Sequence, residues 1–152
     1  MNWNDIINTT SSEYSKTTLV SNFKDVSNSS NLSSLKTAVD NINMSSSGAS
    51  TAADYGMNIA EALFNQTDIK NDGRPKVVVM FTDGEPNHGG DNFNTEVANA
   101  VVAKAKTMKA QGVKVFTVGL FNTAYSKTSD VLKYMYATSS NYKDATTYNI
   151  TI

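Results

Sequence analysis

Two oxygen-bearing side chains stand where a divalent cation could be bound. Thr51 follows a Gly/Ser-rich loop and precedes a helical pattern, whereas Asp83 follows an apolar run, Val77–Phe81, within a Thr-Asp-Gly-Glu turn. Mg²⁺ and Mn²⁺ prefer hydroxyl, carboxylate and water oxygens as ligands. A site of this kind needs neither the single histidine, His88, nor a cysteine, and the chain contains no cysteine.

The apolar run Val77–Phe81 predicts how Asp83 is positioned. Its β-branched and large apolar residues do not alternate with polar ones, which is typical of a strand buried on both faces of a parallel sheet. Open α/β sheets bind ligands at the carboxyl ends of their strands, where Asp83 would lie. A simpler role remains open for each residue. A tight turn alone would explain Asp83-Gly84, and a helix cap alone would explain Thr51.

The remaining patterns alternate between helix and strand. Apolar residues at helical spacing, with a glycine after the longest such segment, predict four helices. They are Leu32–Ile42, Ala53–Phe64, Asn94–Gln111 and Ser129–Ala137. Val113–Leu120 predicts a second buried strand, and Tyr142–Ile152 predicts an irregular segment or a short edge strand. This order indicates an α/β domain.

Three segments carry a resemblance to a known family. They are Ser47–Thr51 with the following Gly56-Met57, the segment Arg74–Pro86, and Gly112–Leu120. In this order they resemble the von Willebrand factor A (VWA) domain, over about Leu19–Tyr148. The detailed amino-acid sequence is most like that of surface proteins of Gram-positive bacteria. The resemblance implies a Rossmann-like three-layer α/β fold, with a mostly parallel central sheet flanked by helices.

The resemblance also implies a metal site built from three loops. Thr51 and Asp83 match the second and third loops, and the expected cofactor is Mg²⁺ or Mn²⁺. The family's first loop carries Asp-x-Ser-x-Ser after the first central strand. A coordination position left open at the metal would accept an acidic side chain of a protein ligand.

The chain departs from the family pattern at its amino-terminal end. Residues 1–18 form a poorly defined polar segment with too few apolar residues for a central strand and a helix, so we expect residues 19–152 to be a partial VWA domain that lacks both. Asp25-Val26-Ser27-Asn28-Ser29 spells the first-loop motif, but the segment before it is short and half polar. We therefore expect a chance match, while the question whether Asp25, Ser27 and Ser29 substitute for the missing loop stays open.

Composition narrows the possible partners and location. A net charge of −1 does not favour nucleic acid as a partner, because proteins that bind nucleic acid need a positively charged surface. No stretch approaches the roughly 20 apolar residues that span a bilayer, and Met1–Thr10 lacks the pattern of a signal peptide. An extracellular or cell-surface location is implied only by the resemblance.

These observations lead to one leading function and two alternatives. The leading hypothesis is a non-catalytic, divalent-cation-dependent protein-binding (adhesion) domain of a bacterial surface or pilus-type protein. The alternatives are a metal-dependent hydrolase that uses Asp83 and a VWA scaffold that has lost metal binding. His88 is predicted to be an exposed loop residue near the metal face, because no spacing suggests a nucleophile and base. Glu85 and Asp91 could lie at the rim of the metal site, but solvated loop charges are commoner.

Overall fold

The computed structural model describes residues 19–42, 51–82, 85–89, 92–119 and 129–140. The chain divides into two compact units, Met1–Ala49 and Ser50–Ile152. In the first unit the described residues form one helix, α2 (Ser29–Asp40), whose amino end is capped by Asn28: its side-chain oxygen accepts hydrogen bonds from the backbone N–H groups of Ser30 and Asn31. The predicted helix is confirmed, although none of its residues is buried.

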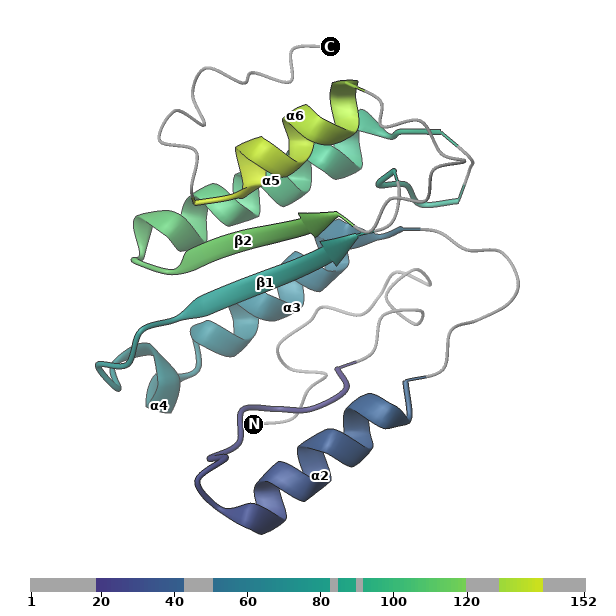
Figure 1. The fold of residues 1–152 in the computed structure, drawn as a ribbon. Helices are drawn as coiled ribbons and strands as arrows, with labels where there is room; N and C mark the ends of the chain where they lie inside the picture. Colours follow the sequence, from purple (N-terminus) through teal and green to yellow (C-terminus); the bar gives the residue numbers. More distant parts are fainter. Residues whose placement is uncertain (1–18, 43–50, 83–84, 90–91, 120–128, 141–152) are drawn as a thin grey trace. The chain divides into compact units, whose positions relative to one another are not determined.

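The second unit contains the other described helices and strands, shown in Figure 1. In chain order they are α3 (Ala53–Phe64), α4 (Thr67–Lys70), β1 (Val77–Thr82), α5 (Thr95–Ala110), β2 (Lys114–Gly119) and α6 (Ser129–Thr138). β1 and β2 pair in parallel, from Val77 opposite Lys114 to Thr82 opposite Gly119. Parallel strands need a crossover connection, and α5 provides it. The predicted α/β class is confirmed, while residues 142–152 lie outside the described part of the chain.

Helix α5 begins and ends where its sequence predicts. The side-chain oxygen of Asn94 accepts hydrogen bonds from the N–H groups of Glu96 (2.9 Å) and Val97 (3.2 Å), which caps the amino end. Gly112 follows the helix with φ = +85°, a left-handed conformation that glycine adopts without strain. These two signals set the ends of α5, which lies between β1 and β2 in the chain order.

One hydrophobic core joins the elements of the second unit. The buried residues of this core come from three long helices, α4 and strand β2: Met57, Phe64, Ile69, Ala98, Val101, Ala105, Met108, Val113, Val115, Val131, Tyr134 and Met135. From β1, Val78 and Met80 pack against it. No helix in the described ranges is both long enough and apolar enough to span a membrane.

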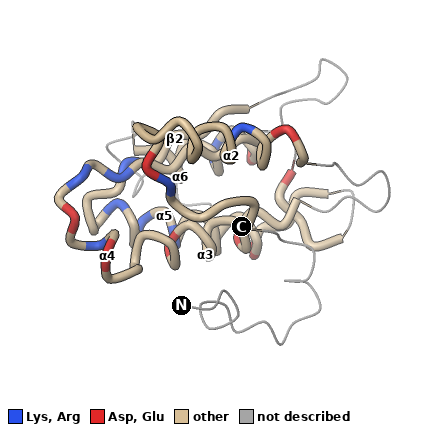
Figure 2. The backbone as a smooth tube through the Cα atoms, turned by 90° about the horizontal axis from the view of Figure 1, so that it is seen from below, with Lys and Arg blue, Asp and Glu red and all other residues tan. Residues whose placement is uncertain are grey.

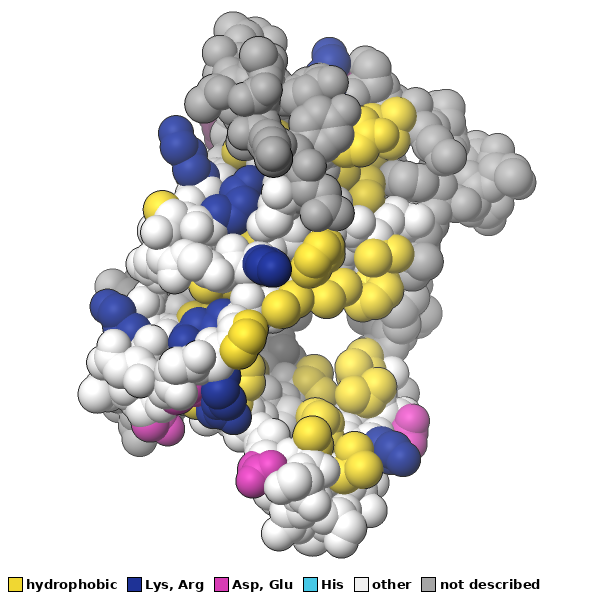
Figure 3. Space-filling view, turned by 60° about the vertical axis from the view of Figure 1, so that its left-hand side comes forward, with side chains coloured by type: hydrophobic (Ala, Val, Ile, Leu, Met, Phe, Trp, Pro, Cys, Tyr) yellow, Lys and Arg dark blue, Asp and Glu magenta, His cyan; other side chains and the backbone are white. Residues whose placement is uncertain are grey.

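The outer face of β1 contradicts the prediction of a strand buried on both faces. Val77, Val79 and Phe81 are 46%, 49% and 64% exposed, and Figure 3 shows hydrophobic side chains gathered at the surface. The physical reason is that α3, α5 and α6 contribute their buried residues to the core on the opposite face, where Val78 and Met80 point. An apolar run without alternation therefore did not distinguish a strand covered on one face from one covered on both.

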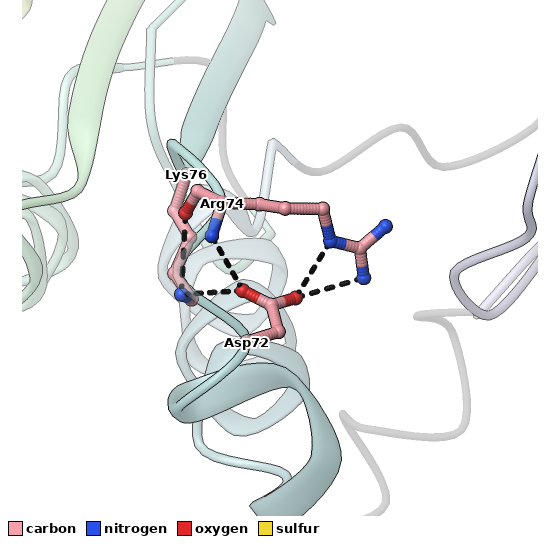
Figure 4. A network of polar contacts seen from close by, with 3 residues as sticks. All are labelled: Asp72, Arg74 and Lys76. Carbon is pink, nitrogen blue, oxygen red and sulfur yellow. Dashed lines mark hydrogen bonds and ion pairs between the residues drawn. The ribbon is translucent and has the colours of Figure 1, made fainter.

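The turn before β1 is held by a network around Asp72, drawn in Figure 4. The carboxylate accepts hydrogen bonds from the backbone N–H of Arg74 (2.9 Å), the Arg74 side chain (2.8 Å) and the Lys76 ammonium (3.3 Å). Acidic and basic residues alternate along this part of the chain near α4 (Figure 2). Asp72 thus has the structural role that Asp often has in turns, and it orients the entry to the strand.

The Asp72 network should be visible in an acid titration. The N–H of Arg74 is the main cause that lowers the pKa of Asp72 from 3.8 to about 2, and the Arg74 and Lys76 side chains add to it against partial desolvation. Because the folded pKa is depressed, this carboxylate stabilises the fold above pH 3.8, and the contribution is lost as the pH falls toward 2. Carboxyl ¹³C NMR should show that Arg74→Ala raises this pKa only in part, since the backbone donor remains. A full return to 3.8 in the variant would contradict the backbone's leading role.

Candidate functional site

A groove runs between β1 and α3 and ends at the carboxyl end of β1. Its volume is about 400 Å³. The lining residues come from the start and one side of α3 and from β1: Thr51, Ala52, Ala53, Gly56, Met57, Ala60, Val78, Val79, Met80, Phe81 and Thr82. The fold therefore brings the Thr51 segment to the same groove as Thr82, the residue directly before Asp83. Asp83 itself lies outside the described residues.

Thr51 is held by its backbone rather than by helix capping. Its carbonyl oxygen accepts hydrogen bonds from the N–H groups of Ala53 (2.8 Å) and Asn87 (3.1 Å). The residue at the capping position of α3 is Ala52, and no side chain caps the helix. The alternative role of Thr51 as a helix cap is thus wrong, because the helix begins one residue later than that role requires.

The loop that follows β1, residues 85–89, is held by hydrogen bonds within itself and to neighbouring segments. The carbonyl oxygen of Pro86 accepts a hydrogen bond from the N–H of Asn94 at the start of α5 (2.8 Å). The Asn87 side chain donates to the carbonyl of Glu85 (2.9 Å) and accepts from the N–H of Gly89 (3.2 Å), which closes the loop on itself. Gly89 has φ = +115°, which favours glycine. The loop is therefore tied to α5 through Pro86 and to the Thr51 segment through Asn87.

His88 makes a contact that the sequence did not reveal. The prediction that it is an exposed loop residue is confirmed, but its Nε2 lies 2.8 Å from Oδ1 of Asp54, in the first turn of α3. The imidazole also stacks on the ring of Tyr55, with centroids 4.6 Å apart. An acidic residue in the first turn of a helix was the one available signal for Asp54. Nothing in the sequence could pair it with a histidine 34 positions away.

Asp54 also shapes the electrostatics behind the loop. It is 7% exposed, so its carboxyl group lies largely out of water. Burial raises the pKa of the Tyr134 phenol, and the nearby charge of Asp54 raises it further. The Tyr134 hydroxyl lies 3.6 Å from Sδ of Met80. Tyr134 consequently stays a neutral core residue, and the negative charge of Asp54 is left to interact with His88.

The predicted metal ligands are oxygen donors, which suits Mg²⁺ or Mn²⁺. Thr51 lines the groove, and a carboxylate follows Thr82 in the sequence. Among the residues that the structure describes, no three His, Cys, Asp or Glu side chains come together as a metal-binding group. Glu85 lies in the ordered loop, while Asp91 is outside the described residues.

The Asp25 motif belongs to the first unit and Thr51 to the second. The Asp25 carboxylate accepts hydrogen bonds from the backbone N–H (3.0 Å) and the hydroxyl (2.7 Å) of Ser27. Ser29 is the first residue of α2, and no strand precedes the motif within residues 19–28. These contacts are those of a turn that leads into a helix, and the interpretation as a chance match stays a prediction.

Comparison with known proteins identifies one family. A family model described as von Willebrand factor type A domain matches residues 7–151, nearly the whole chain. Searches of curated proteins and of solved structures gave no match.

Proposed function

This chain belongs to the von Willebrand factor type A domain family, and from that premise we propose that it is a non-catalytic, divalent-cation-dependent protein-binding domain. Domains of this family generally serve in protein interaction and adhesion, often with a metal ion. In the present chain the proposed ligands are the Thr51 hydroxyl and the Asp83 carboxylate. The cation would supply a Lewis-acidic position for a carboxylate of the protein partner.

One observation carries the proposal: the Thr51 segment shares a groove with the carboxyl end of β1 and is joined by a backbone hydrogen bond to the loop that follows β1. The 3.1 Å bond from the N–H of Asn87 to the carbonyl of Thr51 joins the loop after β1 to the Thr51 segment. Thr51 and Thr82 line the same groove. A hydroxyl and a carboxylate carried by these two segments are oxygen donors of the type that Mg²⁺ takes.

The wider setting of the proposed domain is the surface of a bacterial cell or a pilus. The detailed sequence, with Ser139-Ser140-Asn141-Tyr142 near its end, resembles surface proteins of Gram-positive bacteria and supports this setting, as does the frequent extracellular location of the family. The net charge of −1 and the interspersed charges near α4 favour a protein partner over nucleic acid (Figure 2).

Calorimetric titration of Mg²⁺ and Mn²⁺ into the full chain tests the proposal. We expect saturable binding of one cation, removed by a chelator and not reproduced by Na⁺ at equal ionic strength. Absence of binding would overturn the cation-dependent mechanism and favour a scaffold that has lost its metal. Turnover of a generic phosphate ester that depends on the added metal would instead favour the hydrolase.

A further inference from the structure

The buried side chain of Asp54 pairs with the side chain of His88. An ionised carboxylate that is 7% exposed must be compensated by hydrogen bonds or an opposite charge, since removing it from water is costly. The start of α3 contributes favourably, because the positive end of the helix dipole stabilises an acidic residue in the first turn. The side-chain partner is Nε2 of His88 at 2.8 Å. An ionised Asp54 can only accept, so this bond requires a proton on Nε2.

The imidazole of His88 is contacted on its ring face as well as at Nε2. The Tyr55 ring lies under it at a centroid distance of 4.6 Å and an angle of 25°. Two neighbouring residues of α3 therefore determine both the position and the orientation of the His88 side chain. A loop residue that only faced solvent would show neither contact.

His88 is adjacent to Asn87, whose N–H donates to the carbonyl of Thr51. We propose that Asp54 and His88 form a clamp that holds loop 85–89 against the start of α3, with His88 as a positioning residue for the Thr51 segment. Only the consequence of the clamp rests on the proposed function. By fixing the loop after β1 relative to Thr51, the clamp preorganises the oxygen donors of the cation site.

Amide hydrogen exchange of Asn87, measured by NMR on the full chain without divalent cations, tests the clamp directly. His88→Phe keeps an aromatic ring over Tyr55 but has no donor, whereas His88→Gln keeps an N–H donor at a similar distance along the side chain. Lys133→Gln, which breaks the exposed ion pair with Asp130 on α6, is the matched control. The amides of β2 report whether each variant keeps the fold.

We expect His88→Phe to accelerate the exchange of the Asn87 amide by at least about tenfold, because local opening no longer breaks a charge-assisted hydrogen bond. His88→Gln should retain most of the protection, and Lys133→Gln all of it, with β2 unchanged throughout. Unchanged Asn87 exchange in His88→Phe would overturn the clamp. So would equal acceleration in His88→Gln and His88→Phe, since the donor would then be irrelevant.

A parallel calorimetric titration separates the clamp from the proposed function. If wild-type protein binds Mg²⁺, His88→Phe should weaken binding by about three- to tenfold and His88→Gln by less. This loss is smaller than the roughly 10- to 100-fold cost of losing a residue that contacts a metal ligand directly, because His88 acts through the loop. If wild-type protein binds no cation, the proposed function fails, while the exchange experiment still decides whether the clamp exists. Mg²⁺ affinity unaffected by His88→Phe would overturn the positioning role.

Discussion

Replacing Asp83 with alanine is expected to weaken the binding of Mg²⁺ and Mn²⁺ by at least about 100-fold, since loss of a residue that only supports a metal ligand already costs 10- to 100-fold. Asp83 is the only carboxylate among the two predicted ligands, and the charge of a hard cation is balanced chiefly by carboxylates. Removing it would leave the Thr51 hydroxyl as the remaining predicted side-chain ligand. Calorimetry on the full chain measures this loss, and binding of a protein partner should become insensitive to chelation.

The matched control for Asp83→Ala is Asp68→Ala. Asp68 is exposed in the short helix α4, on the segment that leads to the amino end of β1. The two substitutions change the net charge equally, so they separate a specific ligand from a general electrostatic effect. Equal cation affinities of the two variants would contradict the assignment of Asp83. A loss in both would indicate that nonspecific charge, rather than a built site, attracts the cation.

Replacing Met108 with alanine is expected to lower the free energy of unfolding by about 2–5 kcal/mol, the range for removing a fully buried large aliphatic side chain. Met108 is 0% exposed and belongs to the core that joins α3, α5, α6 and β2. The shortened side chain would leave a cavity where these elements meet. Urea denaturation followed by circular dichroism measures the change in midpoint at constant slope.

Val79→Ala provides the comparison on the outer face of β1. Val79 is 49% exposed, so the expected loss is less than about 1 kcal/mol. A loss as large as that of Met108→Ala would contradict the exposure of the outer face and restore the prediction of a strand buried on both faces. The pair of variants therefore tests the one clear disagreement between sequence pattern and structure.

The elements of the second unit could be predicted because their signals are local. The predicted stop at Gly112 is confirmed, and the Asn94 cap that the structure shows also acts within one turn of α5. The β-branched run Val77–Phe81 identified a strand, yet it could not show how many faces are covered. Burial depends on which other segments pack on the strand, and the composition of the strand does not contain that information.

The candidate site divides in the same way. Thr51 and Asp83 were predicted from loops that end at the edge of an α/β sheet, and their roles as ligands remain predictions. The hydrogen bond between Asn87 and Thr51 joins segments that are distant in sequence, as does the clamp of Asp54 and His88. Neither residue of the clamp stands out by type, because an acid in a first turn and a histidine in a loop are common.

By itself, the sequence determined the α/β class and the places of the longer helices and of the two strands, whereas the short helix α4 was not predicted and the oxygen-donor site stays a prediction. These properties follow from periodicity, capping and turn chemistry, which act over a few neighbouring residues. Only the tertiary structure decided which face of β1 is covered, that Ala52 rather than Thr51 occupies the capping position of α3, and that His88 contacts Asp54. Those outcomes depend on how α3 and the loop after β1 approach each other in space, and long-range packing of that kind leaves no periodic mark in the chain.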